Sequence, residues 1–147
     1  MQGRLGWTIF WALVAVFVVV IAVMVIPAAR ELLMGIPFMI ISGAVLFGLG
    51  VALIFLTVKE KVGGRLKRFL LLTGASAIGI PLGVVLHNAV YGLFIYWFGA
   101  DFWDRAGLGD EPFFFIMAIT VCPTGFLVGA VGRIVLAVRE HRQPSQT

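Results

Sequence analysis

Three polar residues interrupt a long apolar stretch in the second half of the chain: His87, Asn88 and Tyr91. A helix would place His87 and Tyr91 on one face, because they are four residues apart, and Asn88 would adjoin Tyr91. The next apolar stretch carries Thr120 and Cys122, and an antiparallel arrangement would bring these to a similar depth. The five residues together form the candidate polar or ligand-binding site.

Imidazole, amide, phenol and thiol groups inside a membrane span can join helices through hydrogen bonds, or they can bind a ligand or ion. Both interpretations stay open, and the hydrogen-bonded clamp is the simpler one. A metal centre is disfavoured, because His87 and Cys122 leave the tetrahedral coordination of zinc incomplete. The sequence therefore predicts no metal, no cofactor and, with no recognisable catalytic set, no enzymatic activity.

A second polar group precedes the last apolar stretch and contains Asp101, Asp104, Asp110 and Glu111. Carboxylates suit hard cations, but this spacing does not match a calcium-binding EF-hand loop. Asp110 and Glu111 stand directly before Pro112, which is typical of a helix N-terminus. The helix role is the favoured interpretation.

These residues must be positioned by membrane-spanning helices. The chain has 147 residues, of which 61% are hydrophobic and 12% charged, against about 25% charged in soluble domains. This composition excludes a soluble enzyme, a disordered protein and a fibrous protein, and nucleic acid is not an expected partner. A spanning helix needs about 20 apolar residues. The sequence predicts an all-α, four-transmembrane-helix bundle with short loops, forming one domain over residues 1–147, with spans at residues 7–26, 38–58, 69–98 and 113–138.

The first and third predicted spans have unusual lengths. The first is longer than the apolar part of a signal peptide and lacks a following A-x-A site, which favours an uncleaved anchor. The third exceeds a bare span and must tilt, kink or leave the bilayer. Residues 141–147 are polar and predict a flexible cytoplasmic tail.

The distribution of basic residues predicts the orientation. With four spans, nine of the eleven Lys and Arg residues fall on the side that holds both termini. Both termini are therefore expected in the cytoplasm, and short loops favour a prokaryotic cytoplasmic membrane. The link between the second and third spans should contact anionic lipid headgroups through five residues, namely Lys59, Lys61, Arg65, Lys67 and Arg68.

Small residues four apart allow membrane helices to approach closely. Such pairs occur in three of the predicted spans: Ala44 and Gly48, Gly79 and Gly83, and Gly125 and Gly129. They can serve packing within the chain, or contact with a second copy or another membrane protein. Pro81 and Pro123 should bend their helices near mid-membrane, either as plain kinks or as part of a transport site.

The leading functional expectation is a non-enzymatic accessory or structural membrane protein. The alternative is a small transporter or channel subunit with a polar site between the third and fourth helices. The lack of Asp or Glu inside any predicted span disfavours a proton-coupled antiporter of the small four-helix kind.

Overall fold

A computed structural model describes residues 3–33 and 35–142, with side chains described as far as residue 140. Every element of secondary structure in the described residues is a helix, which confirms the all-α class. The elements are α1 (Arg4–Val25), α2 (Pro27–Leu33), α3 (Ile36–Lys59), α4 (Gly64–Phe98), α5 (Phe102–Arg105), α6 (Pro112–Ile116), the π-helical η1 (Met117–Val121) and α7 (Cys122–Arg142).

Four helical stretches are long and apolar enough to cross a membrane: Arg4–Val25, Ile36–Lys59, Gly64–Phe98 and Pro112–Glu140. Each contains most or all of one predicted span. Several helices extend further at the ends, because charged residues outside the hydrocarbon can continue the helical hydrogen bonding. The predicted flexible tail, residues 141–147, lies outside the described side chains, and α7 itself runs to Arg142.

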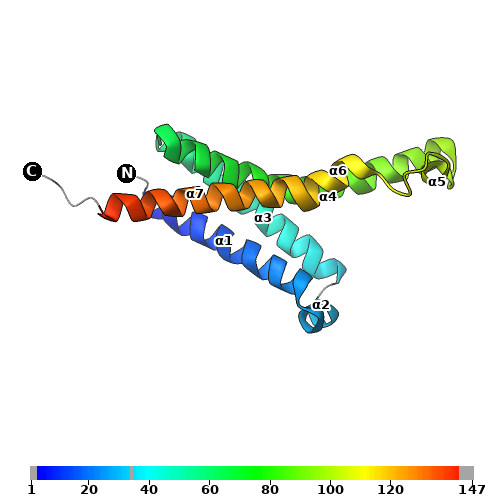
Figure 1. The fold of residues 1–147 in the computed structure, drawn as a ribbon, viewed down its shortest axis with the longest axis horizontal. Coiled ribbons are helices and arrows are strands. Elements are labelled where there is room, and N and C mark those ends of the chain that lie inside the picture. Colours follow the sequence, from blue (N-terminus) through cyan, green and yellow to red (C-terminus); the bar gives the residue numbers. More distant parts are fainter. Residues whose placement is uncertain (1–2, 34, 143–147) are drawn as a thin grey trace, which may run out of the picture.

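The four long helices form two pairs that diverge from a common end (Figure 1). Helix α1 packs on α3, and α4 lies between α3 and α7. The start of α1 and the end of α7 lie at the end where the pairs meet, called here the proximal end. Helices α2 and α5 close the two pairs at the opposite, distal end.

A narrow apolar core holds the two pairs together. Its fully buried members come from every long helix and include Phe10, Leu53, Leu70 and Phe126. The rings of Phe17 and Phe126 stack with their centroids 4.1 Å apart, which joins α1 to α7. Most other large apolar side chains face outward, as expected where lipid is the solvent.

Glycines set the closest approaches between helices. A Cβ atom added at Gly50 would lie 2.8 Å from the carbonyl oxygen of Gly74, so α3 and α4 touch backbone to backbone. Along α4 and α7, Gly79 faces Cys122 and Gly125 faces Ser76. The small residues predicted on α4 and α7 therefore serve packing within the chain.

The small-residue pair predicted on α3, Ala44 and Gly48, does not pack closely against another helix of this chain. A Cβ atom added at Gly48 would meet nothing within 4 Å, and Ala44 is exposed. Helix α3 instead approaches α4 through Gly50 and through Gly43, where an added Cβ atom would lie 3.4 Å from Cβ of Pro81. The face of α3 with Ala44 and Gly48 takes no close part in the packing of this chain.

The two intramembrane prolines have different consequences. Pro81 lies inside α4, which continues past it to Phe98. Pro123 follows the π-helical turn η1, in which the N–H of Cys122 bonds to the carbonyl of Met117, five residues back. The wider π turn lets the helix pass the missing proline donor with local adjustment of its hydrogen bonds.

Candidate functional site

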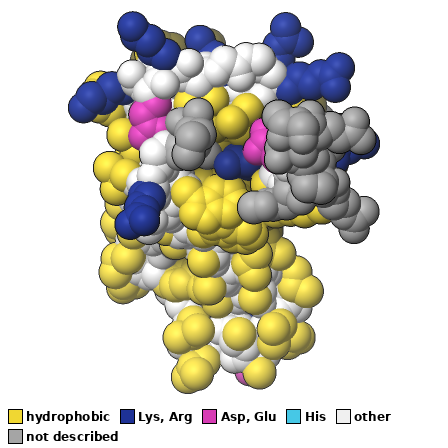
Figure 2. Space-filling view, turned by 90° about the vertical axis from the view of Figure 1, so that its left-hand side faces the viewer, with side chains coloured by type: hydrophobic (Ala, Val, Ile, Leu, Met, Phe, Trp, Pro, Cys, Tyr) yellow, Lys and Arg dark blue, Asp and Glu magenta, His cyan; other side chains and the backbone are white. Residues whose placement is uncertain are grey.

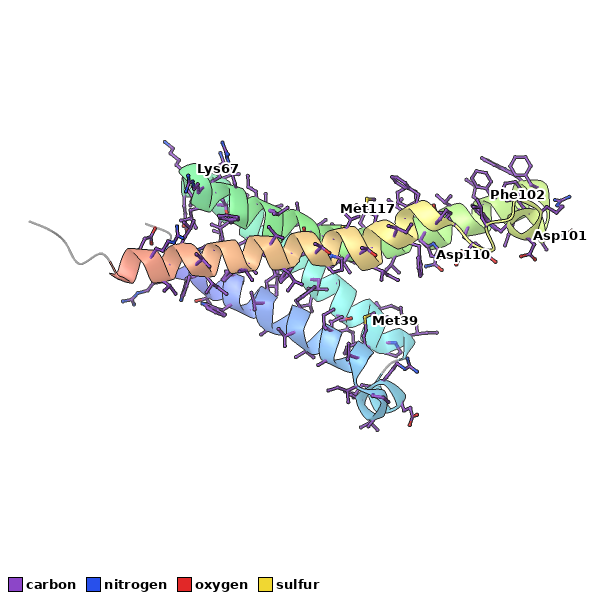
Figure 3. All side chains as sticks on the ribbon, in the orientation of Figure 1. Met39, Lys67, Asp101, Phe102, Asp110 and Met117 are labelled. Atoms are coloured by element: carbon purple, nitrogen blue, oxygen red, sulfur yellow. The ribbon has the colours of Figure 1, made fainter. Side chains whose placement is uncertain are left out.

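His87 lies on α4 and contacts the start of the last span. Its Nδ1 atom is 3.1 Å from the carbonyl oxygen of Glu111 and 3.3 Å from Oε2 of the same residue. Its Nε2 atom is 3.7 Å from Oδ1 of Asp110. Asp110, labelled in Figure 3, belongs to the loop that returns from the distal tip towards α6. The imidazole therefore bridges α4 and the N-terminus of α6.

Glu111 is the buried acceptor of this cluster. Only 4% of its surface is exposed, and its carboxylate accepts hydrogen bonds from the N–H groups of Phe113 and Phe114. These bonds cap α6, and a negative charge there interacts favourably with the helix dipole. Asp110 in turn accepts a bond of 2.7 Å from the N–H of Glu111. The helix N-terminal role that the sequence favoured for this acidic pair agrees with these contacts.

The hydrogen-bond chemistry of the cluster is one-sided. All three groups within reach of the imidazole are oxygen acceptors, so His87 acts as the donor. A neutral ring with its proton on Nδ1 satisfies the Glu111 contact, and a doubly protonated ring would also attract Asp110. The arrangement is a polar clamp that ties α4 to α6.

Tyr91 shares a face of α4 with His87, as predicted, and its ring stacks on the imidazole with centroids 6.3 Å apart. The ring of Tyr91 stacks on the buried Trp103 of α5, with centroids 5.8 Å apart and planes 6° from parallel. The indole N–H of Trp103 donates to the carbonyl of Tyr91 at 3.2 Å. The exposed Asn88 donates its side-chain amide to the carbonyl of Val84 on its own helix. The predicted neighbourhood of His87 and Tyr91 is therefore present, whereas the amide of Asn88 bonds within its own helix.

The predicted proximity of Cys122 to His87 is wrong. Cys122 lies against Gly79, eight residues and about 12 Å along α4 from His87, and Thr120 is exposed. The depth estimate counted from the ends of the apolar runs, whereas glycine contacts determine the true register. Because Gly83 faces Ala118, His87 falls opposite the beginning of α6. The available signal for its true partners was the position of Asp110 and Glu111, directly before the last span.

An aromatic arm projects at the distal end, formed by residues 91–105 at the end of α4 and in α5. Its packed rings belong to Tyr91, Phe94, Phe98, Phe102 and Trp103. The guanidinium of Arg105 donates to the carbonyl of Phe98 at 2.7 Å and closes the end of α4. Tyr96 and Trp97 remain outside this packing, with 83% and 61% of their surfaces exposed. The labelled Asp101 and Phe102 mark the tip in Figure 3.

The proximal end is basic. Figure 2 views it directly and shows Lys and Arg side chains around the rim, with apolar side chains between and below them. The exposed basic residues of the α3–α4 link are Lys59, Lys61, Arg65, Lys67 and Arg68. Arg133 is buried instead, with its guanidinium 4.7 Å from the ring centroid of Trp7. The carboxylate of Glu60 accepts the N–H of Gly3 at 2.7 Å and ties the start of α1 to this link.

Within the described residues, no three His, Cys, Asp or Glu side chains are grouped so that they could hold a metal ion. Comparison with known proteins finds no family model, curated protein or solved structure that matches this chain.

Proposed function

We propose that this protein is a non-enzymatic accessory subunit of a membrane assembly, embedded in a prokaryotic cytoplasmic membrane with both termini in the cytoplasm. The observation that carries the proposal is the unused small-residue face of α3. An added Cβ atom at Gly48 would meet nothing within 4 Å, and Ala44 is exposed one turn away. The equivalent stripes of α4 and α7 are occupied by contacts inside the chain.

Close approach over small residues is a main source of helix association in lipid, since lipid tails are as apolar as Leu side chains. The exposed Ile41 and Val51 lie on the same face of α3, one turn beyond each end of the Ala44–Gly48 stripe. A spanning helix of another subunit would approach α3 most closely at this stripe. The partner is thus a membrane protein or a second copy of the chain.

The orientation follows from charge. The start of α1, the end of α7 and the basic α3–α4 link lie at the proximal end, and the exposed acids Asp101, Asp104 and Asp110 lie at the distal end. Lys and Arg are retained on the cytoplasmic side of bacterial membranes. The distal aromatic arm then stands on the outer side.

Gly48→Ile tests the proposed association, with Val131→Ile on the exposed face of α7 as the control. Position 48 is open, so the bulkier side chain should leave the fold intact. We expect a discrete complex in mild detergent from native membranes to dissociate with Gly48→Ile and to persist with the control. A complex that survives Gly48→Ile, or a wild-type protein that is purely monomeric without partners, would contradict the proposal.

A transporter or channel subunit is the second candidate, and the π turn η1 favours it. Single π turns occur often at functional positions, and this one lies next to Pro123 in the same span that starts at the His87–Glu111 clamp. The test is ion flux into vesicles that contain the purified protein. Flux that disappears with His87→Ala in a folded protein supports this candidate, and flux no greater than in empty vesicles excludes it for ions.

A further inference from the structure

A broad groove opens between the two helix pairs in the distal half of the molecule. It passes the Gly43–Pro81 contact, where α3 and α4 are close, and the two helices diverge towards the distal end (Figure 1). Its walls come from residues 36–47 of α3, residues 80–85 of α4 and two residues of α1, and it encloses about 670 Å³. Met39, labelled in Figure 3, belongs to the α3 wall.

The walls offer almost no polar chemistry. The one hydroxyl in the lining belongs to Ser42, which donates to the carbonyl of Phe38 at 2.7 Å within α3. The other lining residues are aliphatic, aromatic or glycine. Water gains too few hydrogen bonds to occupy such a space, and a polar solute would leave its own groups unsatisfied. The occupant must therefore be hydrocarbon.

The volume of the groove matches the hydrocarbon chain of a lipid. An apolar cavity of about 150 Å³ holds the six carbons of benzene, so the groove scales to roughly two dozen carbon atoms. That is the size of one or two acyl chains.

The mouth of the groove has the residues expected at headgroup level. Asn88 is exposed and lies seven residues beyond Pro81 and three beyond Val85, on the same face of α4. The exposed Tyr96 follows two turns further out. Amide and phenol groups can hydrogen-bond to a headgroup, and Tyr is enriched at this level of the bilayer. Hydrocarbon walls thus continue into a polar and aromatic rim.

We propose that this groove binds the acyl chain of a membrane lipid from the distal leaflet, with the lipid headgroup beside Asn88. The chain enters between Met39 of α3 and Val85 of α4 and extends towards the Gly43–Pro81 contact. The lipid fills the space between the α1–α3 pair and the α4–α7 pair. Gly48 does not line the groove, so the partner contact there is tested by a different substitution, although Ala44 borders both surfaces.

The test uses vesicles of phosphatidylethanolamine and phosphatidylglycerol that contain a phospholipid with a photoreactive diazirine on its acyl chain. The full-length protein is illuminated, and the labelled residues are mapped by mass spectrometry. We expect labelling concentrated on the groove walls around Met39 and Val85. Val85→Trp and Met39→Trp should each lower it several-fold by filling the space, since both positions are at least half exposed and tolerate a larger side chain.

Val131→Trp is the matched control, because Val131 is similarly exposed on α7 and does not line the groove. It should leave groove labelling unchanged, and circular dichroism should be alike for all variants. Labelling spread evenly over the lipid-facing residues, or unaffected by both groove substitutions, would overturn the proposal. A Val85→Cys variant in a Cys122→Ser background that forms disulfide-linked dimers would also overturn it, because a second copy would then occupy the groove.

Discussion

Gly129 provides the sharpest test of the contact between α4 and α7. A Cβ atom added there would lie 2.8 Å from the backbone nitrogen of Thr73 and 2.9 Å from the carbonyl oxygen of Phe69. Both are backbone atoms, so relief requires the helices to move apart. Overpacking of this kind costs about 1–3 kcal/mol. We therefore expect Gly129→Ala to weaken the packing of the last span.

The higher helix propensity of Ala raises the unfolding free energy, so this gain must be subtracted before the steric cost at Gly129 can be read. Replacing Gly with Ala inside a helix gains about 1 kcal/mol. Gly92→Ala supplies the control, because Gly92 is an exposed helical position on α4 where an added Cβ atom would meet nothing within 4 Å. The difference in unfolding free energy between the two variants then isolates the steric cost, about 1–3 kcal/mol.

The assay is unfolding in mixed micelles with increasing sodium dodecyl sulfate, followed by circular dichroism. The Gly92→Ala protein should unfold at the same or a higher detergent fraction than wild type, and the Gly129→Ala protein at a lower fraction than Gly92→Ala. Equal stability of the two variants would refute the backbone contact at Gly129. It would also refute the register that places His87 opposite the start of α6.

Three further outcomes are expected. His87→Ala should destabilise the protein modestly, by about 0.6 and at most about 1.7 kcal/mol if the clamp is purely structural, measured in the same micelle titration. Reporter fusions at both termini should be active only in the cytoplasm, and an external signal from either end would contradict the orientation. Replacing the five basic residues of the α3–α4 link with Gln should weaken binding to anionic vesicles, each charge contributing about 1 kcal/mol, and unchanged binding would remove the proposed lipid contact.

The spans were predictable because length and hydropathy act over about 20 residues and tolerate errors of a few positions. The predicted run at residues 38–58, for example, falls inside α3, which spans Ile36–Lys59. The third predicted run is longer than a bare bilayer span, and α4 accommodates the extra length by continuing to Phe98 in the aromatic arm. Such features depend on composition over many residues, which the sequence shows directly.

The register between helices depends on single contacts and was not predictable in the same way. Counting residues placed Cys122 near His87, but the fit of Cys122 against Gly79 places it about two turns away. The sequence marked Pro123 as a break, but it did not show that a π turn would precede it. Several small-residue stripes were visible, and nothing in their spacing distinguished the occupied stripe at Gly79 from the open one at Gly48.

The position of α4 explains why its small residues are used more fully than those of α3. Helix α4 has neighbours on two sides, so it needs a smooth surface towards each of them. Gly74 meets the backbone of α3, while Gly79 meets Cys122 of α7 and Gly83 meets Ala118 of η1. Helix α3 has α1 and α4 on its inner side only, which leaves Gly48 towards the lipid. Gly48 therefore adds no close packing to its own chain, and the proposed contact with another membrane protein would use this open position.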